Sequence, residues 1–409
     1  MRKVVACACA VLLLVCAGRS RAAEGGRPNL VLIICDDLGW GDLGCYGNTS
    51  IKTPNLDRLA AQGSRLTDFY AAGIQCTPSR AGMLTGRYPV RFGLTFSLMT
   101  DAGVGMPAAE VTLPEALRAV GYATMLSGKW HLGDKPQFHP LRHGFERFFG
   151  LLRGHDTEPR EIWRDGRVVE REAAVDGLTG RFTEEAVKFI GEKRDRPFFL
   201  MLAHTAPHVP LTGSYADAVK EIDDSAGQIM AALERGGLLD NTVILFTSDN
   251  GPAVDQGEKG GSTGPLRAGK YSTFEGGIRV PAIVSWKGRI APRVESRPAF
   301  LPDVFPTFVR LAAGKLPADR PVDGKDLLPL LLENKPRGGE EFFFYFRDQM
   351  RACRVADWKL KLPDREGESL MLFDLKTDPG EKHDLAGGRA DVVDQLRGRM
   401  RDFEKSARR

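Results

Sequence analysis

Residues 29–47 read NLVLIICDDLGWGDLGCYG, and this stretch decides the fold class. A continuous apolar run from Leu30 to Cys35 is followed at once by two aspartates and a glycine-rich segment. Such a run is typical of a strand that is buried on both faces of a sheet. Residues 241–251, NTVILFTSDNG, repeat the arrangement of an apolar strand that ends in acid and glycine.

Helical and strand patterns alternate around these two segments, which predicts an α/β fold with a mainly parallel central sheet covered by helices on both faces. After residue 335 the pattern changes to short strands joined by turns, followed by one last helix. This change predicts a small C-terminal antiparallel α+β subdomain. We expect helices at 53–63, 78–84, 112–121, 179–193, 215–237 and 390–405, and strands at 64–72, 122–131, 197–204, 280–286, 341–346, 350–362 and 370–379.

The first 23 residues have the pattern of a secretory signal peptide. A basic start, MRK, precedes the 15-residue apolar run VVACACAVLLLVCAG and then small residues. The run is too short to favour a membrane span, and a buried helix or an uncleaved anchor is the alternative interpretation. We therefore predict a signal peptide at 1–23, a catalytic domain at 24–335, a subdomain at 336–409, and a secreted or periplasmic protein.

Charge and cysteine content narrow the possible partners. The chain has 57 basic and 53 acidic residues, and the predicted leader holds four of the basic ones, so the remainder has no net charge. This balance argues against a nucleic-acid partner and against an anionic membrane surface. Cys35, Cys45, Cys76 and Cys353 remain, enough for two disulfides but too few for a disulfide framework. Cys35 is expected to be a buried small apolar residue.

The two acidic strand ends predict a metal site. In open α/β sheets, sites form beyond the carboxyl ends of the strands. Asp36 and Asp37 follow one apolar strand, and Asp249 and Asn250 follow another. Carboxylate and amide oxygens are hard ligands that suit Ca²⁺ or Mg²⁺ better than zinc. Turn chemistry explains either pair alone, but both together on one sheet favour a metal.

Cationic side chains follow other strand ends and predict an anion site beside the metal. Lys129 and His131 lie two residues apart in SGKWHLG, where an extended backbone would point both the same way. His208 lies between prolines, and Lys270 lies in a loop near glycine. Each alone is compatible with a solvated or structural residue, but together they favour a phosphate or sulfate ester as the ligand.

Several of these segments resemble the type I sulfatases, in the order found in that family. CTPSRAGMLTGR at 76–87 is similar to the family signature, and GYATMLSGKWHLG at 121–133 is similar to its second signature. PQFHPLRHGFERFFG resembles the branch that contains arylsulfatase A and N-acetylgalactosamine-6-sulfatase. The resemblance extends from Asn29 to LFDLKTDPGEKHDLA near the C-terminus, and it also includes the segments APHVP, TSDNG and LRAGKYSTFEGGIRVP.

The resemblance implies an alkaline-phosphatase-like α/β/α fold and a modified residue. A maturation enzyme would convert Cys76 to formylglycine, an aldehyde whose hydrate carries two hydroxyls. One hydroxyl would attack the sulfur of the substrate, and the other would then expel sulfate. The metal would be one Ca²⁺, with Asp36, Asp37, residue 76, Asp249 and Asn250 as its ligands.

The resemblance also implies roles for the basic residues. Arg80 would hold the modified residue in place. Lys129 and Lys270 would bind the sulfate and stabilise the charge that develops on it. His131 would assist the modified residue as a base, and His208 would protonate the leaving oxygen as a general acid. His204 is a second histidine nearby, but the proline pattern aligns His208 with the family.

One segment departs from the family pattern. Some arylsulfatases place a serine before a His-Asp pair, whereas this chain reads Arg153-Gly154-His155-Asp156. Either a hydroxyl contact to sulfate is missing, or Arg153 or His155 replaces it. Segments 94–112, 153–178 and 252–268 are expected to line the mouth of the site and to select the substrate.

The sequence leaves three functions to be distinguished. The first is a secreted, calcium-dependent sulfatase that acts on a sulfated carbohydrate or an aryl sulfate. The resemblance to the N-acetylgalactosamine-6-sulfatase branch favours exo-action on a sulfated galactose-type sugar. A phosphodiesterase or phosphonate hydrolase of the same fold is the second. A non-catalytic protein that binds sulfated glycans is the third.

Overall fold

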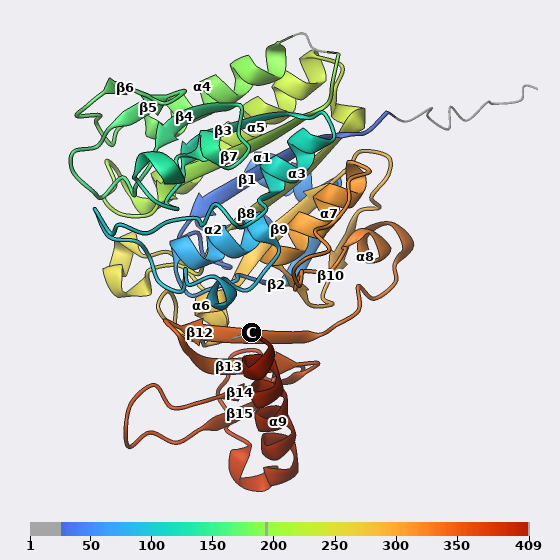
Figure 1. Cartoon of the computed structure of the whole chain (residues 1–409). Helices are drawn as coiled ribbons and strands as arrows, with labels where there is room; N and C mark the ends of the chain where they lie inside the picture. Colours follow the sequence, from blue (N-terminus) through green and yellow to red (C-terminus); the bar gives the residue numbers. More distant parts are fainter. Residues whose placement is uncertain (1–25, 193–194, 408–409) are drawn as a thin grey trace, which may run out of the picture.

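The computed structural model describes residues 26–192 and 195–407, so the predicted signal peptide lies outside the described residues. Its main feature is an eleven-stranded sheet in the order β10-β2-β9-β8-β1-β7-β3-β4-β5-β6, with β11 also paired to β2 (Figure 1). The neighbours β8, β1, β7, β3 and β4 are parallel. The strands are β1 (Asn29–Asp36), β2 (Ser64–Tyr70), β3 (Ala123–Lys129), β4 (Arg147–Leu151), β5 (Ile162–Arg164), β6 (Arg167–Glu170), β7 (Phe198–Pro207), β8 (Thr242–Ser248), β9 (Arg279–Ser285), β10 (Arg293–Glu295) and β11 (Ala299–Phe300).

Helices cover both faces of this sheet because its central strands are apolar on both faces. Leu30, Leu32 and Ile34 of β1 pack in one core cluster, whereas Val31 and Ile33 pack in the other. Successive side chains of a strand point to opposite faces, so one apolar run supplies two cores. The first core packs against α2 (Cys76–Thr85), α3 (Leu113–Ala119), α7 (Val304–Leu311) and α8 (Leu328–Glu333), and the second against α1 (Pro54–Ala61), α4 (Leu178–Gly191) and α5 (Tyr215–Arg235).

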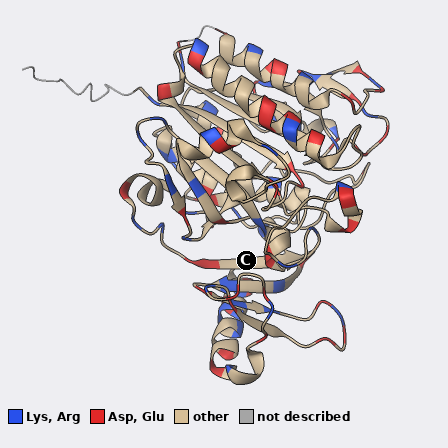
Figure 2. Ribbon diagram, turned by 180° about the vertical axis from the view of Figure 1, so that it is seen from behind, with Lys and Arg blue, Asp and Glu red and all other residues tan. Residues whose placement is uncertain are grey.

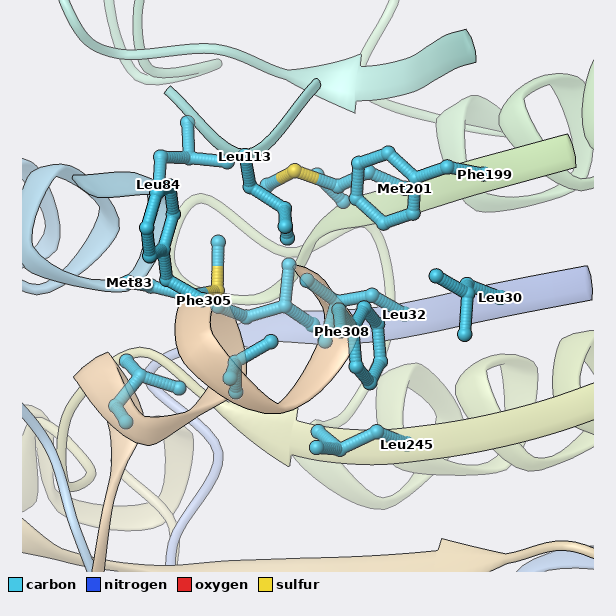
Figure 3. Packing of buried hydrophobic residues seen from close by; sticks show 14 of the residues in the cluster. Leu30, Leu32, Met83, Leu84, Leu113, Phe199, Met201, Leu245, Phe305 and Phe308 are labelled. Atoms are coloured by element: carbon cyan, nitrogen blue, oxygen red, sulfur yellow. The ribbon is translucent and has the colours of Figure 1, made fainter. Parts of the chain in front are cut away.

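The first core shows how closely the layers pack (Figure 3). Leu32 of β1 and Leu245 of β8 lie beneath Phe305 and Phe308 of α7, and Leu84 of α2 completes the cluster. Each of these side chains is at most 1% exposed. This packing fixes α2 against the sheet, and α2 carries Cys76 at its first position.

The C-terminal part forms a second, antiparallel sheet in the order β12-β13-β14-β15, with α9 against it. It does not have a core of its own, because Phe342 and Phe344 of β12 share a cluster with Tyr70 of β2 and Ile278 of α6 (Glu275–Ile278). The domain boundary at residue 335 stays a prediction. The elements are β12 (Glu341–Phe346), β13 (Gln349–Val355), β14 (Trp358–Lys361), β15 (Met371–Asp374) and α9 (Ala390–Ala407).

These observations confirm the predicted architecture and also show what the sequence patterns missed. The predicted helices and most predicted strands have a counterpart within a few residues at their ends. The predicted strand 350–362 is instead two strands, β13 and β14, joined by a turn, and the predicted strand 370–379 ends at Asp374. The short strands β4, β5, β6, β10 and β11 and the helices α6, α7 and α8 were not predicted. Among the described residues all four remaining cysteines are free, and Cys35 is fully buried as expected.

Charge is distributed without a dominant sign. In Figure 2 acidic and basic residues are interspersed over the helices and strands. None of the helices in 26–192 and 195–407 is long and apolar enough to span a membrane.

Candidate functional site

Strand register brings the two acidic strand ends together. Strands β1 and β8 are parallel neighbours in which Cys35 is paired with Ser248. The residues that follow, Asp36 and Asp37 on one strand and Asp249 on the other, must therefore meet at one edge of the sheet. Asp37 has a left-handed backbone, with φ of 66°, which turns the chain out of the strand direction at this point.

The acidic cluster also contains Cys76. One ligand atom from each of Asp36, Asp37, Cys76 and Asp249 lies within 4.8 Å of all the others, and the four residues are at most 2% exposed. The backbone amide of Asp37 donates to Asp249 Oδ1 at 3.3 Å. Asn250 donates its Nδ2 to Asp37 Oδ1 at 2.7 Å. Its own Oδ1 is buried and has no hydrogen-bond partner among the described residues.

Cys76 is the first residue of α2, two residues before the predicted start of that helix. Its thiol donates to Asp36 Oδ1 at 3.0 Å. Burial, and then the charge of Asp36, raise the pKa of this thiol well above its usual value. An unmodified Cys76 is thus protonated at neutral pH, and a protonated thiol is a poor nucleophile.

Arg80 lies one turn further along α2 and connects this helix by hydrogen bonds to the ends of β8 and β3. Its Nε donates to Asp249 Oδ2 at 2.8 Å, and its Nη1 donates to the carbonyl oxygen of Lys129 at 3.0 Å. The guanidinium is completely buried, so it positions α2 against β8 and β3 instead of facing solvent. Burial, and then Asp36, raise the pKa of Asp249 to about 6 against the lowering effect of Arg80.

Two lysines from different strand ends supply the remaining positive charge. Lys129 at the end of β3 donates from Nζ to Asp36 Oδ2, and Lys270 donates from Nζ to Asp37 Oδ2 at 2.8 Å. Burial alone would raise the pKa of Asp36, but Lys129 and other cations hold it well below its usual value. Burial would lower the pKa of Lys270, yet Cys76 and Asp37 raise it.

His131 lies at the same edge, although its backbone is not as expected. The prediction that 129–131 is one extended segment is wrong, because β3 ends at Lys129 and His131 has a left-handed φ of 57°. The His131 Nε2 lies 3.2 Å from the carbonyl oxygen of Leu98. Because a carbonyl only accepts, Nε2 carries the proton and the buried Nδ1, which has no partner in the described chain, is the acceptor. Burial, and then Lys129, lower the pKa of His131.

The structure separates the two histidines at the end of β7, of which His204 lies within the strand and His208 directly follows it. His208 Nε2 lies 3.6 Å from Asp37 Oδ2, and its Nδ1 bonds to the carbonyl oxygen of Val209. His204 Nε2 instead lies 3.0 Å from Ser225 Oγ on α5, and burial lowers its pKa to about 3. Only His208 therefore faces the acidic cluster, whereas His204 belongs to the packing between β7 and α5.

The segment that departs from the family pattern has two different environments. Arg153 turns away to Asp134, with Nε 2.8 Å from Oδ2. A Cβ built on Gly154 would lie 3.8 Å from Lys129 Nζ, so a side chain at position 154 would approach the lysine. The His155 ring packs edge-on against His208, with centroids 5.6 Å apart. Burial, and then His208, lower the pKa of His155 to about 4.

The three predicted mouth segments each contact a residue of the site. Leu98 contacts His131, Gly154 lies near Lys129, and the carbonyl oxygen of Pro252 accepts from the backbone of Lys270 at 2.8 Å. The sequence patterns missed a fourth segment after β7. His208 and residues 210–214 line a pocket of about 350 Å³ together with His155, the end of β7, the start of α4 and the first turns of α5.

The residues of the acidic cluster fit a hard divalent cation. Three buried carboxylates within 4.8 Å repel one another, and the unpaired Asn250 Oδ1 is one more buried oxygen acceptor. These carboxylate and amide oxygens are the ligands that Ca²⁺ and Mg²⁺ prefer, whereas an unmodified Cys76 adds a thiol sulfur to the cluster.

Comparison with known proteins agrees with this geometry. The family model described as Sulfatase matches residues 28–315, which is more than half of the chain. The chain belongs to the sulfatase family. A model described as N-sulphoglucosamine sulphohydrolase, C-terminal, matches residues 269–406 of this sulfatase.

Named relatives place the sulfatase among sulfuric ester hydrolases. It is 41% identical to mouse N-acetylgalactosamine-6-sulfatase over 86% of this chain and 75% of that protein. It is 37% identical to human arylsulfatase A over 90% of this chain and 85% of that protein. The crystal structure of Ps i-CgsB in complex with k-i-k-neocarrahexaose superimposes with a TM-score of 0.85 at 31% identity, covering 93% of each chain. The predicted family, the alkaline-phosphatase-like fold class and sulfate-ester hydrolysis are thereby confirmed.

Proposed function

We propose that this sulfatase depends on calcium and uses a formylglycine made from Cys76 to hydrolyse sulfated carbohydrates or aryl sulfates. The observation that carries the proposal is the position of residue 76. Its side chain shares one buried cluster with three carboxylates, and two lysines donate into that same cluster. One buried cluster thus contains the precursor of the nucleophile, the proposed metal ligands and the cations that would bind the sulfate.

The bound metal would be held by Asp36, Asp37, residue 76, Asp249 and Asn250, and it would align a sulfate oxygen and favour the ionised nucleophile. Formylglycine would supply two hydroxyls on one carbon, one for attack and one for release. Arg80 supports both groups, because its bond to Asp249 holds α2 in place.

The lysines would bind the sulfate, and the histidines would transfer protons. Lys129 and Lys270 would exchange their aspartate contacts for sulfate oxygens and stabilise the charge that develops on them. His131 has an unpaired Nδ1 acceptor and would take a proton from residue 76. His208 donates its Nδ1 proton to the carbonyl oxygen of Val209, so in the imidazolium form Nε2 is the nitrogen that would donate a proton to the leaving oxygen and become unprotonated.

As the substrate we propose a sulfated galactose-type sugar that is attacked at a chain end. This assignment is supported by the 41% identity to mouse N-acetylgalactosamine-6-sulfatase and by the complex of Ps i-CgsB with k-i-k-neocarrahexaose. The pocket beside His208 provides space next to the leaving oxygen. We further propose that the chain is exported by its N-terminal leader and that a maturation enzyme modifies Cys76 before it acts.

The deciding experiment is the mass of the tryptic peptide that contains residue 76. Formylglycine makes this peptide lighter by the difference between a CH₂SH group and an aldehyde, and active protein that carries only unmodified cysteine would refute the mechanism. A Cys76→Ser variant has one hydroxyl and no route to release sulfate, so we expect at most one turnover.

Substrate preference tests the phosphodiesterase alternative. We expect p-nitrophenyl sulfate to be hydrolysed faster than the phosphate analogue, and calcium chelation to slow the sulfate reaction. A faster phosphate reaction would support the alternative.

A further inference from the structure

The C-terminal turn Asp378–Lys382 contacts the loop that carries Lys270. The turn belongs to the segment LFDLKTDPGEKHDLA, to which the proposed function assigns no role. The Lys270 loop is defined here as residues 267–275, which end at the first residue of α6. Its contacts with the turn are made mainly by Glu381, a residue with a left-handed φ of 53° and no exposed surface.

Glu381 holds both ends of the Lys270 loop. At one end its backbone carbonyl oxygen accepts from Arg267 Nη1 at 2.9 Å. At the other end its side-chain Oε2 accepts from the backbone amide of Glu275 at 2.6 Å. Lys270 lies between these two anchor points. The backbone amide of Gly276 also donates to the carbonyl oxygen of Arg267 at 2.8 Å, so Glu381 reinforces a bond that joins the two ends of the loop.

Lys359 of β14 fixes Glu381 in this position. Its Nζ lies 2.8 Å from Glu381 Oε1 and 2.9 Å from Glu275 Oε1. None of the three side chains is exposed to solvent. A buried charge without its partner is strongly unfavourable, so this ion triad tolerates only one arrangement of the two carboxylates around the lysine. Tyr70 adds a hydroxyl bond to Glu275 Oε2 at 2.5 Å.

The loop needs such support because its own backbone is strained. Ala268 and Tyr271, on either side of Lys270, both have left-handed φ angles, of 59° and 68°. Strained non-glycine positions persist only where the surroundings over-determine them. The backbone amide of Lys270 donates to the carbonyl oxygen of Pro252, and that of Tyr271 donates to the carbonyl oxygen of Ile74 at 3.1 Å, but the long Lys270 side chain must still reach Asp37.

We propose that Glu381 and Lys359 are positioning residues that clamp the Lys270 loop and so hold the Lys270 ammonium at the sulfate. The proposal rests on the proposed function, in which Lys270 binds the sulfate. In this proposal the C-terminal subdomain contributes to catalysis indirectly. It holds the loop that carries Lys270, and Glu381 and Lys359 act through Lys270 and do not touch the substrate themselves.

A double-mutant cycle tests the clamp. Glu381→Gln keeps the size of the side chain and removes its charge, and Lys270→Ala removes the group that the clamp is proposed to place. Small misplacements of a binding group cost up to about 100-fold in rate. We expect Glu381→Gln to lower kcat/KM for p-nitrophenyl sulfate by about 10- to 100-fold in the wild type, and by less than about twofold in the Lys270→Ala background. The thermal midpoint should fall equally in both backgrounds.

Two further variants keep the test decisive. Asp223→Asn is the matched control, because Asp223 is also a buried carboxylate that accepts from two backbone amides, those of Asn55 and Leu56. It should lower the thermal midpoint and leave kcat/KM unchanged. If Glu381→Gln does not fold, Arg267→Met loosens the other anchor from an exposed position and should show the same dependence on Lys270.

The outcomes separate the clamp from the proposed function. An equal Glu381→Gln effect in both backgrounds, or no effect in the wild type, overturns the clamp while leaving the role of Lys270 intact. A Lys270→Ala variant as active as the wild type overturns the proposed role of Lys270, and the clamp fails with it.

Discussion

Replacing His208 by glutamine should slow the release of a poor leaving group far more than the release of a good one. His208 is the histidine whose Nε2 faces Asp37, at 3.6 Å, while its Nδ1 is engaged by the backbone. Glutamine fills similar space but cannot deliver a proton. A sugar hydroxyl needs that proton as it leaves, whereas p-nitrophenolate departs readily as an anion.

The size of the effect follows from the role. A positioned general acid contributes about 10²- to 10⁴-fold, or about 3–5.5 kcal/mol of transition-state stabilisation. Because the imidazole side chain is only 12% exposed, bulk water replaces it poorly as a proton source. We expect His208→Gln to lower kcat for a sulfated monosaccharide by this factor, and kcat for p-nitrophenyl sulfate by about tenfold or less.

The assay compares the two substrates with the same enzyme preparation. Sulfate release from the sugar is followed by ion chromatography, and p-nitrophenolate is followed by absorbance. His204→Gln is the matched control: His204 is buried against Ser225, so this change should lower stability and leave the ratio of the two kcat values unaltered. Equal losses for both substrates in His208→Gln would refute the acid role, because they would indicate damage to the site as a whole.

Three further predictions concern metal binding, pH and packing. Calcium should raise the free energy of unfolding by about 2.7 kcal/mol at 100 times its dissociation constant. The Asn250→Leu variant should bind calcium more weakly than the wild type. If the calcium titration of this variant is unchanged, Asn250 is not a calcium ligand. The hydrogen bond from Arg164, partly opposed by burial, lowers the pKa of Glu185 to about 2 from 4.5, so this carboxylate stabilises the fold above pH 4.5 and loses that contribution as the pH falls toward 2. Since Arg164 is 42% exposed, solvent screening reduces this contribution to about 1 kcal/mol. The free energy of unfolding in urea should therefore be lower by that amount in Glu185→Gln than in the wild type at pH 7, and the two values should converge near pH 2. A difference that stays constant with pH would contradict the role of the Arg164–Glu185 pair. Phe308→Ala in the core of Figure 3 should cost about 3–5 kcal/mol, against less than about 0.5 kcal/mol for Leu332→Ala on the surface, measured by the same unfolding.

Much of the fold could be predicted because the signals were local. The run from Leu30 to Cys35 predicts a buried strand from its own composition, and the amphipathic period of residues 215–237 predicts α5. The short strands β5, β6 and β10, at or next to the edges of the sheet, were missed because three or four residues carry no reliable period, and their pairing is set by the neighbouring strand instead of by propensity.

The candidate site could be assembled from sequence only in part. The acidic pairs, the lysines and Cys76 were identified by residue type and by their place after strands. The left-handed backbone of His131 was not, since nothing in SGKWHLG forces a positive φ. The ring of His155 against His208 likewise joins segments about 50 residues apart, and no local pattern reports such a contact.

The sequence by itself determined which groups this protein possesses and the order in which strands deliver them, because apolar runs, acid pairs and helix periods are properties of short segments. The tertiary structure decided which of those groups meet. The register of Cys35 with Ser248 brings the two acidic ends into one cluster, and the turn at Glu381 reaches back about 110 residues to contact the Lys270 loop. The physical reason is that contacts between distant segments are selected by the burial and charge pairing of the whole chain, which no window of the sequence contains.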